Sequence, residues 1–339
     1  MLRFVGDINF ADGFFDIGFG VGSRIKQGLN PFEHIERFPE DIWIGNCECV
    51  IADISNKKGI YSKQFRINTQ DLLAVNHLDI YSVANNHVMQ HGEHAFKQMI
   101  AYFDDNKITT IGRDDSISHI FKHQGKSIGI VAFSQRKEKY LSRPLYWYNP
   151  EYKDIEAAYK RIEKAAYHVV YVHWGNEFIN YPYGDQKRFA HWLVDLGFDL
   201  IIGTHPHVLQ GYEIYRGSYI FYSLGNFVFN MPTTSSQMSA IISVDLSLDP
   251  VKLSTQYVRI YPDYFPHLVK ETNFSIEYSF KTLNRLLAND EENEVYYKMV
   301  YKAIKEYRKK NMKVFLKNIN KFDFQDFKEI IMDFFKRKL

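Results

Sequence analysis

The sequence predicts an α/β protein, and two observations support that fold class. Short apolar runs recur along the chain and end in polar or glycine-rich turns, namely LRFVGD, DIWIGN, DIYSVANN, HVVYVHWG, DLIIGTHPH and YIFYSLGN. Between several of these runs, apolar residues repeat at the three- and four-residue spacing of amphipathic helices. This alternation favours a sheet whose functional residues lie on loops at the carboxyl ends of its strands.

The individual elements follow in chain order. Residues 92–106 (GEHAFKQMIAYFDDN) and 185–199 (DQKRFAHWLVDLGFD) have helical spacing, and Gly197 is expected to end the second helix. Residues 119–134 predict a hairpin that turns at QGK. From about Tyr219 to Ile260 one strand follows another, which predicts a second antiparallel layer or an extension of the sheet.

After about Asn273 the pattern becomes helical and rich in lysine. From Lys298 to the end the chain has 13 Lys or Arg against 5 Asp or Glu, although the net charge of the whole chain is only +2. We therefore expect two domains, residues 1–268 and a basic helical extension, residues 269–339. The extension either packs against its own domain with its lysines in water, which we favour, or contacts a membrane surface or a partner protein.

The composition also bears on the location and partners of the chain. The first ten residues, MLRFVGDINF, lack the long apolar run of a signal peptide or membrane span. The two cysteines, Cys47 and Cys49, are few enough for a reducing compartment. We expect a cytoplasmic protein. Its Tyr and Phe residues are spread along the chain, which favours core packing and no nucleic-acid partner.

Polar side chains that suit metal binding follow several of the predicted strands. His205 and His207 stand two apart in GTHPH, a spacing that would point both to one face of an extended strand. The other strand ends supply Asp7, Asn46, Glu48, Asn86, His87 and His173. In a parallel sheet these ends can meet in one crevice. The mixed nitrogen and oxygen ligands suit zinc, manganese or iron better than calcium or magnesium.

Six of these residues are too many for one tetrahedral ion, and they fit two divalent ions about 3.5–4 Å apart. We expect Glu48 to bridge the ions. Asp7 and His207 would hold one ion, and Asn86, His173 and His205 the other. His87 would remain free to stabilise developing charge or to protonate the leaving group.

The motifs GDINF, NCE, ANNHVMQHG, HWGNE, GTHPHVLQGYE and YSLGNFVF occur in this order over about residues 2–245. In this respect the chain resembles the poly-γ-glutamate capsule-biosynthesis (CapA-type) family, whose domain is similar to calcineurin-type metallophosphoesterases. The resemblance implies a four-layer α/β/β/α sandwich and a dinuclear metal centre. Two positions depart from the pattern: Gln90 stands where the family usually has Asp, and Asn9 where the wider superfamily often has a histidine ligand.

The resemblance also implies that Arg66 in KQFRIN faces the pocket as an anion clamp. We expect Arg66, Glu177 and Asn226 to contact substrate, and we expect His87, Arg66 and Asn226 to take part in catalysis. For Asn226 in YSLGNF a second interpretation stays open, in which it belongs to a tight turn and orients a metal ligand through its amide.

The leading hypothesis is a metal-dependent hydrolase with two Mn, Zn or Fe ions, linked by the resemblance to capsule or cell-surface polymer synthesis. Its substrate would be a phosphoester or another anionic molecule or polymer, and an amide bond of a γ-linked glutamate polymer is a second target. The alternative is a non-catalytic factor that binds an anionic polymer or assists capsule assembly. Asn9 and Gln90 favour that alternative, because both weaken a catalytic site while leaving a cleft.

Overall fold

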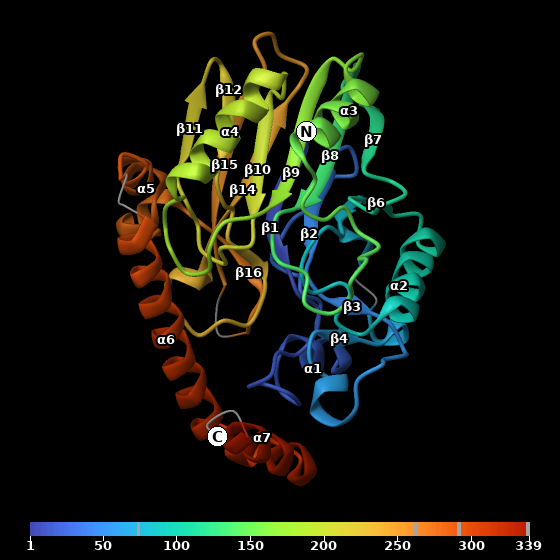
Figure 1. Cartoon of the computed structure of the whole chain (residues 1–339), viewed down its shortest axis with the longest axis vertical. Helices are drawn as coiled ribbons and strands as arrows, with labels where there is room; N and C mark the ends of the chain where they lie inside the picture. The colour runs from blue at the N-terminus through green and yellow to red at the C-terminus, as the bar shows by residue number, and fades with distance from the viewer. Residues whose placement is uncertain (73–74, 261–262, 290–292, 337–339) are drawn as a thin grey trace.

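The computed structural model describes residues 1–72, 75–260, 263–289 and 293–336, and it contains two large β-sheets (Figure 1). The first sheet has the order β16 (Pro266–Val269), β15 (Lys252–Ile260), β14 (Met238–Asp245), β1 (Leu2–Ile8), β2 (Ile42–Cys47), β5 (Ile80–Ser82) and β6 (Thr109–Ile111), with β13 (Asn226–Val228) also paired to β1. The second has the order β11 (Tyr212–Tyr215), β12 (Ser218–Phe221), β10 (Leu200–Thr204), β9 (Tyr167–His173), β8 (Lys126–Ser134) and β7 (Ser118–His123). Strands β3 (Val50–Ile51) and β4 (Arg66–Ile67) form a small separate pair.

The two large sheets pack against each other, and helices cover their outer faces. Phe4 and Ile44 of the first sheet share a buried core with Val169 and Ile202 of the second. Helix α2 (Glu93–Asp105) packs on the outer face of the first sheet, and helices α3 (Tyr152–Ile162) and α4 (Gly184–Leu196) pack on the second. The predicted α/β/β/α sandwich is therefore confirmed.

The apolar pattern of the sequence explains these layers. In β1, Leu2 and Phe4 face the core between the sheets, whereas Val5 and Ile8 pack in the core beneath α2. Helix α2 forms within one residue of its expected bounds, and α4 begins one residue early and ends at Leu196, because Gly197 ends it as expected with a φ of 125°. The hairpin of β7 and β8 turns at Gln124 and Gly125, both with positive φ.

Parallel pairing brings the carboxyl ends of the central strands to one edge of the sandwich. Strands β1, β2, β5 and β6 are parallel to one another, with Asp7 opposite Asn46. Strands β8, β9, β10 and β12 are parallel in the second sheet, with His173 opposite Thr204. Strands β14, β15 and β16 are antiparallel and extend the first sheet. Of the two predicted alternatives, the structure therefore has the sheet extension and not a second antiparallel layer.

The C-terminal part is helical and packs onto the sandwich. It contains α5 (Phe280–Leu286), α6 (Asn293–Lys317) and α7 (Phe324–Lys336), and in Figure 1 α6 descends from α5 to α7 at the bottom. Tyr296 and Val300 of α6 pack against Ile179 and Tyr181, while the lysines of its middle stay exposed. The boundary between residues 268 and 269 stays a prediction. Within the part of the chain that the structure describes, every helix is too short or too polar to span a bilayer.

Candidate metal centre

The predicted ligands lie together at the carboxyl edge of the two sheets, fully buried. Glu48 follows β2, and its Oε1 lies 3.6 Å from His173 Nε2 and 3.7 Å from His207 Nε2. Asp7 near the end of β1 places Oδ2 3.5 Å from His207 Nδ1 and Oδ1 3.9 Å from His173 Nδ1. Because a ligand atom lies about 2.0–2.2 Å from a zinc ion, Glu48 Oε1 and the Nε2 atom of either histidine lie at a separation at which two ligands can share one ion.

Glu48 belongs to two groups of ligand atoms, which fits its predicted bridging role. Asp7, Glu48 and His173 form one group, and Glu48, His205 and His207 form the other, with the ligand atoms of each group within 4.8 Å of one another. The expected division, with Asp7 and His207 on one ion and Asn86, His173 and His205 on the other, stays a prediction: Asp7 also lies 3.5 Å from His207, although these two groups place it with His173. His173 ends β9, opposite Thr204, while both histidines of GTHPH follow β10.

The two histidines of GTHPH do not continue the strand. Strand β10 ends at Thr204, and His205 and His207 have φ values of +94° and +57°. Residues other than glycine rarely adopt this left-handed region, and strain of this kind concentrates at functional sites. The expectation of an extended strand end was therefore wrong, although both imidazoles still point to the same cluster.

Amide and hydroxyl groups around the ligands fix their orientation. Asn46 Nδ2 donates to Asp7 Oδ1 at 2.8 Å and lies 3.3 Å from His173 Nδ1. Thr204 Oγ1 lies 3.1 Å from the same His173 Nδ1 and donates its own proton to the Val172 carbonyl at 3.4 Å, so this oxygen can accept a hydrogen bond from a protonated Nδ1. Asn86 Oδ1 lies 2.8 Å from His173 Nε2, which places a predicted amide ligand directly beside an imidazole ligand. Partners of this kind set the tautomer and the ring orientation of metal-binding histidines.

Asn226 acts behind His207 and is itself fully buried. Its Nδ2 donates to the carbonyls of His207 and Ser236, so its Oδ1 accepts from His207 Nδ1 at 2.9 Å. This arrangement leaves Nε2 of His207 available to a metal. The catalytic and substrate-contacting roles expected for Asn226 do not fit a side chain so enclosed, whereas the alternative of orienting a ligand does.

The unpaired polar atoms of the cluster show that its residues fit a cation. Both carboxylate oxygens of Glu48 and both ring nitrogens of His205 are buried without a hydrogen-bond partner among the described residues. Burial raises the pKa of Asp7 and of Glu48, and the neighbouring Asp7 raises that of Glu48 further. Burial also lowers the pKa of His173 and His205 well below the ordinary value. A divalent cation would satisfy all of these lone pairs and offset the buried negative charge.

His87 lies at the edge of the cluster and outside both ligand groups. Its Nε2 is 3.9 Å from Glu48 Oε1, and its Nδ1 is 2.9 Å from Gln90 Oε1, so Gln90 still supplies a hydrogen-bond partner where the family usually has Asp. Burial lowers the pKa of His87 to about 4. The imidazole is therefore neutral at pH 7, and it could protonate a leaving group only if the charge of a bound substrate raised that pKa.

The position of Arg66 differs from the expectation that it faces the pocket as an anion clamp. Its Nε donates to the Ser62 carbonyl, and its Nη1 donates to the Ala52 carbonyl and to Asn68 Oδ1. The guanidinium lines a separate pocket with Lys26 and Lys63 and does not clamp an anion at the cluster. The cause is local: Phe65 has a φ of +53° and stacks on His87 at 4.1 Å, so Arg66, the next residue in the chain, turns away.

Glu177, which was expected to contact substrate, is half-buried on the loop after β9. It lies close enough to Glu48 to raise the pKa of Glu48.

Three phenylalanines that sequence reasoning missed surround the exposed side of the cluster. Phe65 stacks on His87, the ring of Phe229 lies 4.9 Å from that of His207, and the ring of Phe178 lies 6.4 Å from it. Phe65 and Phe229 lie within the quoted segments KQFRIN and YSLGNFVF, and Phe178 directly follows HWGNE. Their sequence signal is only this adjacency, because aromatic residues are common throughout the chain.

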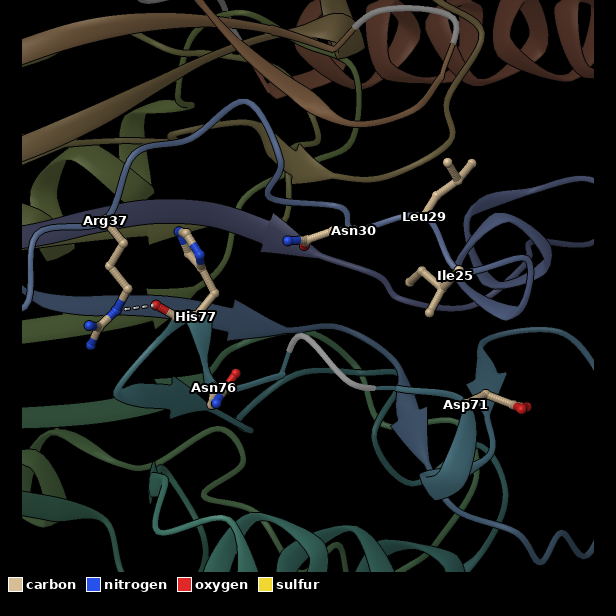
Figure 2. A pocket seen from close by; sticks show the side chains of 8 residues that line it. Ile25, Leu29, Asn30, Arg37, Asp71, Asn76 and His77 are labelled. Carbon is tan, nitrogen blue, oxygen red and sulfur yellow. Dashed lines mark hydrogen bonds between the residues drawn. The ribbon is translucent and has the colours of Figure 1, made fainter.

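A separate pocket of about 520 Å³ is lined by Ile25, Leu29, Asn30, Arg37, Asp71, Asn76 and His77 (Figure 2). None of the cluster residues lines it. Arg37 Nε donates to the His77 carbonyl at 2.9 Å, and the His77 ring stacks on Phe32 at 4.3 Å. This pocket is therefore separate from the candidate centre.

His77→Phe should make folding less sensitive to acid. Burial and the nearby Arg37 lower the pKa of His77 to about 4 in the folded protein, below the value of 6.5 for an exposed histidine. The neutral ring thus contributes stability above pH 6.5 that is lost as the pH falls toward 4, by about 3 kcal/mol at most. Urea unfolding of the metal-free protein at pH 7.5 and pH 4.5 measures this loss. The exposed His94→Asn is the control, and equal pH dependence in wild type and His77→Phe would contradict the assignment.

Comparisons with known proteins bear on the family of the chain. Residues 1–231 match the model of the family described as bacterial capsule synthesis protein PGA_cap. The chain is 33% identical over 177 residues to the PGA biosynthesis protein CapA of Bacillus subtilis, covering 49% of this chain and 47% of that protein. It is 32% identical over 200 residues to the capsule biosynthesis protein CapA of Bacillus anthracis, covering 52% and 48%.

The solved structures that resemble this fold are more distant. A novel phosphatase from Mycoplasma pneumoniae superimposes with a TM-score of 0.45 and 14% identity, covering 78% of this chain and 95% of that one. The 5'-nucleotidase of Candida albicans superimposes with a TM-score of 0.46 and 13% identity, covering 92% and 58%. The chain spans about half the length of the two Bacillus relatives. Because the family model matches more than half of the chain, this protein belongs to the PGA_cap family of bacterial capsule synthesis proteins, as its motifs predict.

Proposed function

We propose that this chain is a metal-dependent hydrolase that acts on a phosphoester in the synthesis of a capsule or another cell-surface polymer. The observation that supports it best is Glu48, whose two buried and unpaired oxygens belong to both groups of ligand atoms. Two divalent ions of Mn, Zn or Fe held there would supply Lewis acidity toward the scissile group and lower the pKa of a water molecule. The polymer link rests on the family and on the names of the Bacillus relatives.

The residues of the candidate centre have different proposed roles, which follow from their positions. Asp7, Glu48, Asn86, His173, His205 and His207 would hold the ions. Asn46 and Asn226 hold Asp7 and His207 in place. The neutral His87, directed at Glu48 from the rim, can take a proton or donate a hydrogen bond to the substrate. Since Arg66 is turned away, we expect the ions to supply most of the positive charge that a phosphate requires.

An amide bond in a γ-linked polymer remains a second target of the same chemistry. A non-catalytic polymer-binding factor is the alternative, and one observation favours it: Asn9 Oδ1 accepts from the Ala11 amide at 2.9 Å, so this side chain adds no ligand to the cluster. We also propose a reducing, cytoplasmic location, supported by the buried free thiols of Cys47 and Cys49, and contact of the basic C-terminal helices with the capsule machinery.

Metal content and hydrolysis together test the proposal. Protein purified without chelator should contain about two transition-metal ions per chain and should hydrolyse bis(4-nitrophenyl) phosphate, and a chelator should abolish the activity until metal is restored. A surface group of His34, Asp263 and His267 could add adventitious metal, so His34→Ala is measured alongside. Protein that holds two ions but hydrolyses neither phosphodiesters, phosphomonoesters nor γ-glutamyl amides would favour the binding factor.

A further inference from the structure

We propose that helix α6, which lies beyond the residues matched by the family, forms one wall of the substrate pocket and selects a small uncharged ring next to the scissile group. The inference rests on the proposed function for the position of the scissile group at the metal cluster. Its own evidence is a cavity and the side chains that line it.

The cavity lies between α6 and the loops beside the cluster. It measures about 130 Å³ and is lined by Gly13, Phe14, Phe15, Asp16, Phe65, Phe229, Asn230, Pro232, Tyr307, Asn311 and Val314. The last three residues come from successive turns of one face of α6. The pocket is thus completed by a segment that begins more than sixty residues after the family match ends.

Aromatic contacts join this cavity to the candidate ligands. Phe65 and Phe229 line the cavity and contact the rings of His87 and His207. On the α6 side, the ring of Tyr307 stacks on Phe178 at 4.4 Å and 24°. Phe178 is fixed in turn by its amide, which donates to the Pro206 carbonyl between the two histidines of GTHPH at 2.8 Å. A group bonded to the scissile atom would therefore extend into this cavity.

The helix is held firmly against the loops that line the cavity. Phe315 of α6 packs with Ile17 and Ile60, and in α7 Asp326 receives Lys63 Nζ at 2.7 Å while Glu329 accepts from the Ile60 amide at 2.8 Å. These contacts lie on both sides of the cavity, on the loop before α1 (Val21–Lys26) and on the segment before β4. Tyr307 and Asn311 are thus fixed parts of the wall and not side chains of a loose tail.

The lining predicts the chemistry of the occupant. It consists of aromatic rings, the amides of Asn230 and Asn311, and the carboxyl of Asp16, with no Lys, Arg or His among these residues. Asn230 donates to Asp16, and Glu177 lies near the Tyr307 hydroxyl, so negative charge surrounds the polar edge. A negatively charged leaving group would be repelled there, whereas a flat neutral ring can stack on the aromatic faces.

The size of the cavity agrees with one ring. An engineered apolar cavity of about 150 Å³ in another protein binds benzene, so about 130 Å³ accommodates one six-membered ring but no longer chain. Burial and the adjacent Asp12 raise the pKa of Asp16 to about 7, so near neutral pH this carboxyl also donates a hydrogen bond in part of the molecules. The amides and Asp16 together suit hydroxyl or carbonyl groups on the edge of such a ring.

Calorimetric binding of three phosphonates to the metal-loaded full chain tests the inference without relying on turnover. We expect phenylphosphonate to bind about tenfold more tightly than methylphosphonate, and 4-carboxyphenylphosphonate to lose most of that gain. Tyr307→Ala should reduce the preference for phenyl over methyl to less than about threefold. Tyr301→Ala, on the same helix with a side chain 71% exposed, is the matched control and should keep the wild-type preference.

A second variant makes the test independent of a loss of folding. Asn311→Lys adds a positive charge to the wall and should bind the carboxylated probe more tightly than phenylphosphonate, which reverses the wild-type order. Wild-type affinities in both variants, or no preference among the probes in the wild type, would overturn the inference. Ester hydrolysis without ring preference would refute this inference alone, whereas ring-selective phosphonate binding without hydrolysis of any ester would refute the proposed function and leave this inference standing.

Discussion

Replacing Glu48 by Gln should abolish hydrolysis and stabilise the metal-free protein at the same time. With metal present, kcat/KM for a phosphodiester should fall at least about a thousandfold, or ~4 kcal/mol, because a neutral amide cannot neutralise two cations as one carboxylate does. Both groups of ligand atoms contain Glu48, so the metal content should fall as well. Without metal, the same change removes a buried ionisable group whose pKa is raised by burial and by Asp7, and the melting temperature should rise.

The two opposite effects separate a metal ligand from a structural carboxylate. If Glu48 served the fold, Gln would lower the melting temperature with and without metal. The matched control is Glu93→Gln, which changes an exposed carboxylate paired with Lys97 on α2 and should alter neither property. Elemental analysis, hydrolysis of bis(4-nitrophenyl) phosphate and thermal unfolding with and without chelator supply the three measurements. Retention of full activity in Glu48→Gln would contradict the candidate centre.

The sequence predicted which candidate ligands lie together better than it predicted their detailed arrangement, for a physical reason. Asp7, Glu48 and the histidines follow apolar runs, and parallel strands bring such positions to one edge whatever the details of register. The pairing of ligands depends on register and on the backbone after β10, where two histidines have positive φ. No pattern in GTHPH predicts this conformation, so the division of the ligands between two ions stays a prediction.

Side chains outside the strand ends were harder to place. Arg66 lies in a short strand pair, and its guanidinium donates to nearby backbone carbonyl groups. A sequence motif alone does not predict these hydrogen bonds. Tyr307 lies in the segment that the sequence predicts to be helical, but its position beside the cluster follows from the packing of α6. Contacts between segments so distant along the chain depend on the whole fold and not on local pattern.

Gly6→Ala should be among the most destabilising single substitutions in this protein. A Cβ at Gly6 would lie 1.8 Å from the Gly225 carbonyl oxygen and 2.8 Å from its carbonyl carbon, and both are backbone atoms that no rotamer change can move. Strand β13 must leave β1 to make room, which breaks the hydrogen bond from the Asp7 amide to the Gly225 carbonyl. We expect a loss of at least about 4 kcal/mol, or a melting temperature lower by roughly 10 °C.

The same displacement would reach the candidate centre, because Asn226 directly follows Gly225 and fixes the ring of His207. Folded Gly6→Ala molecules should therefore bind metal less tightly as well, a coupled loss that a defect elsewhere in the fold would not produce. Gly125→Ala is the control: its Cβ would meet open space, and only its φ of +77° opposes the change, at a cost of about 1 kcal/mol. Chemical unfolding and metal titration of both variants measure the two effects. Equal and small losses of stability and metal affinity in the two variants would show that β13 can move away from β1 at little cost. The close approach of these two strands would then not explain the position of Asn226 behind His207.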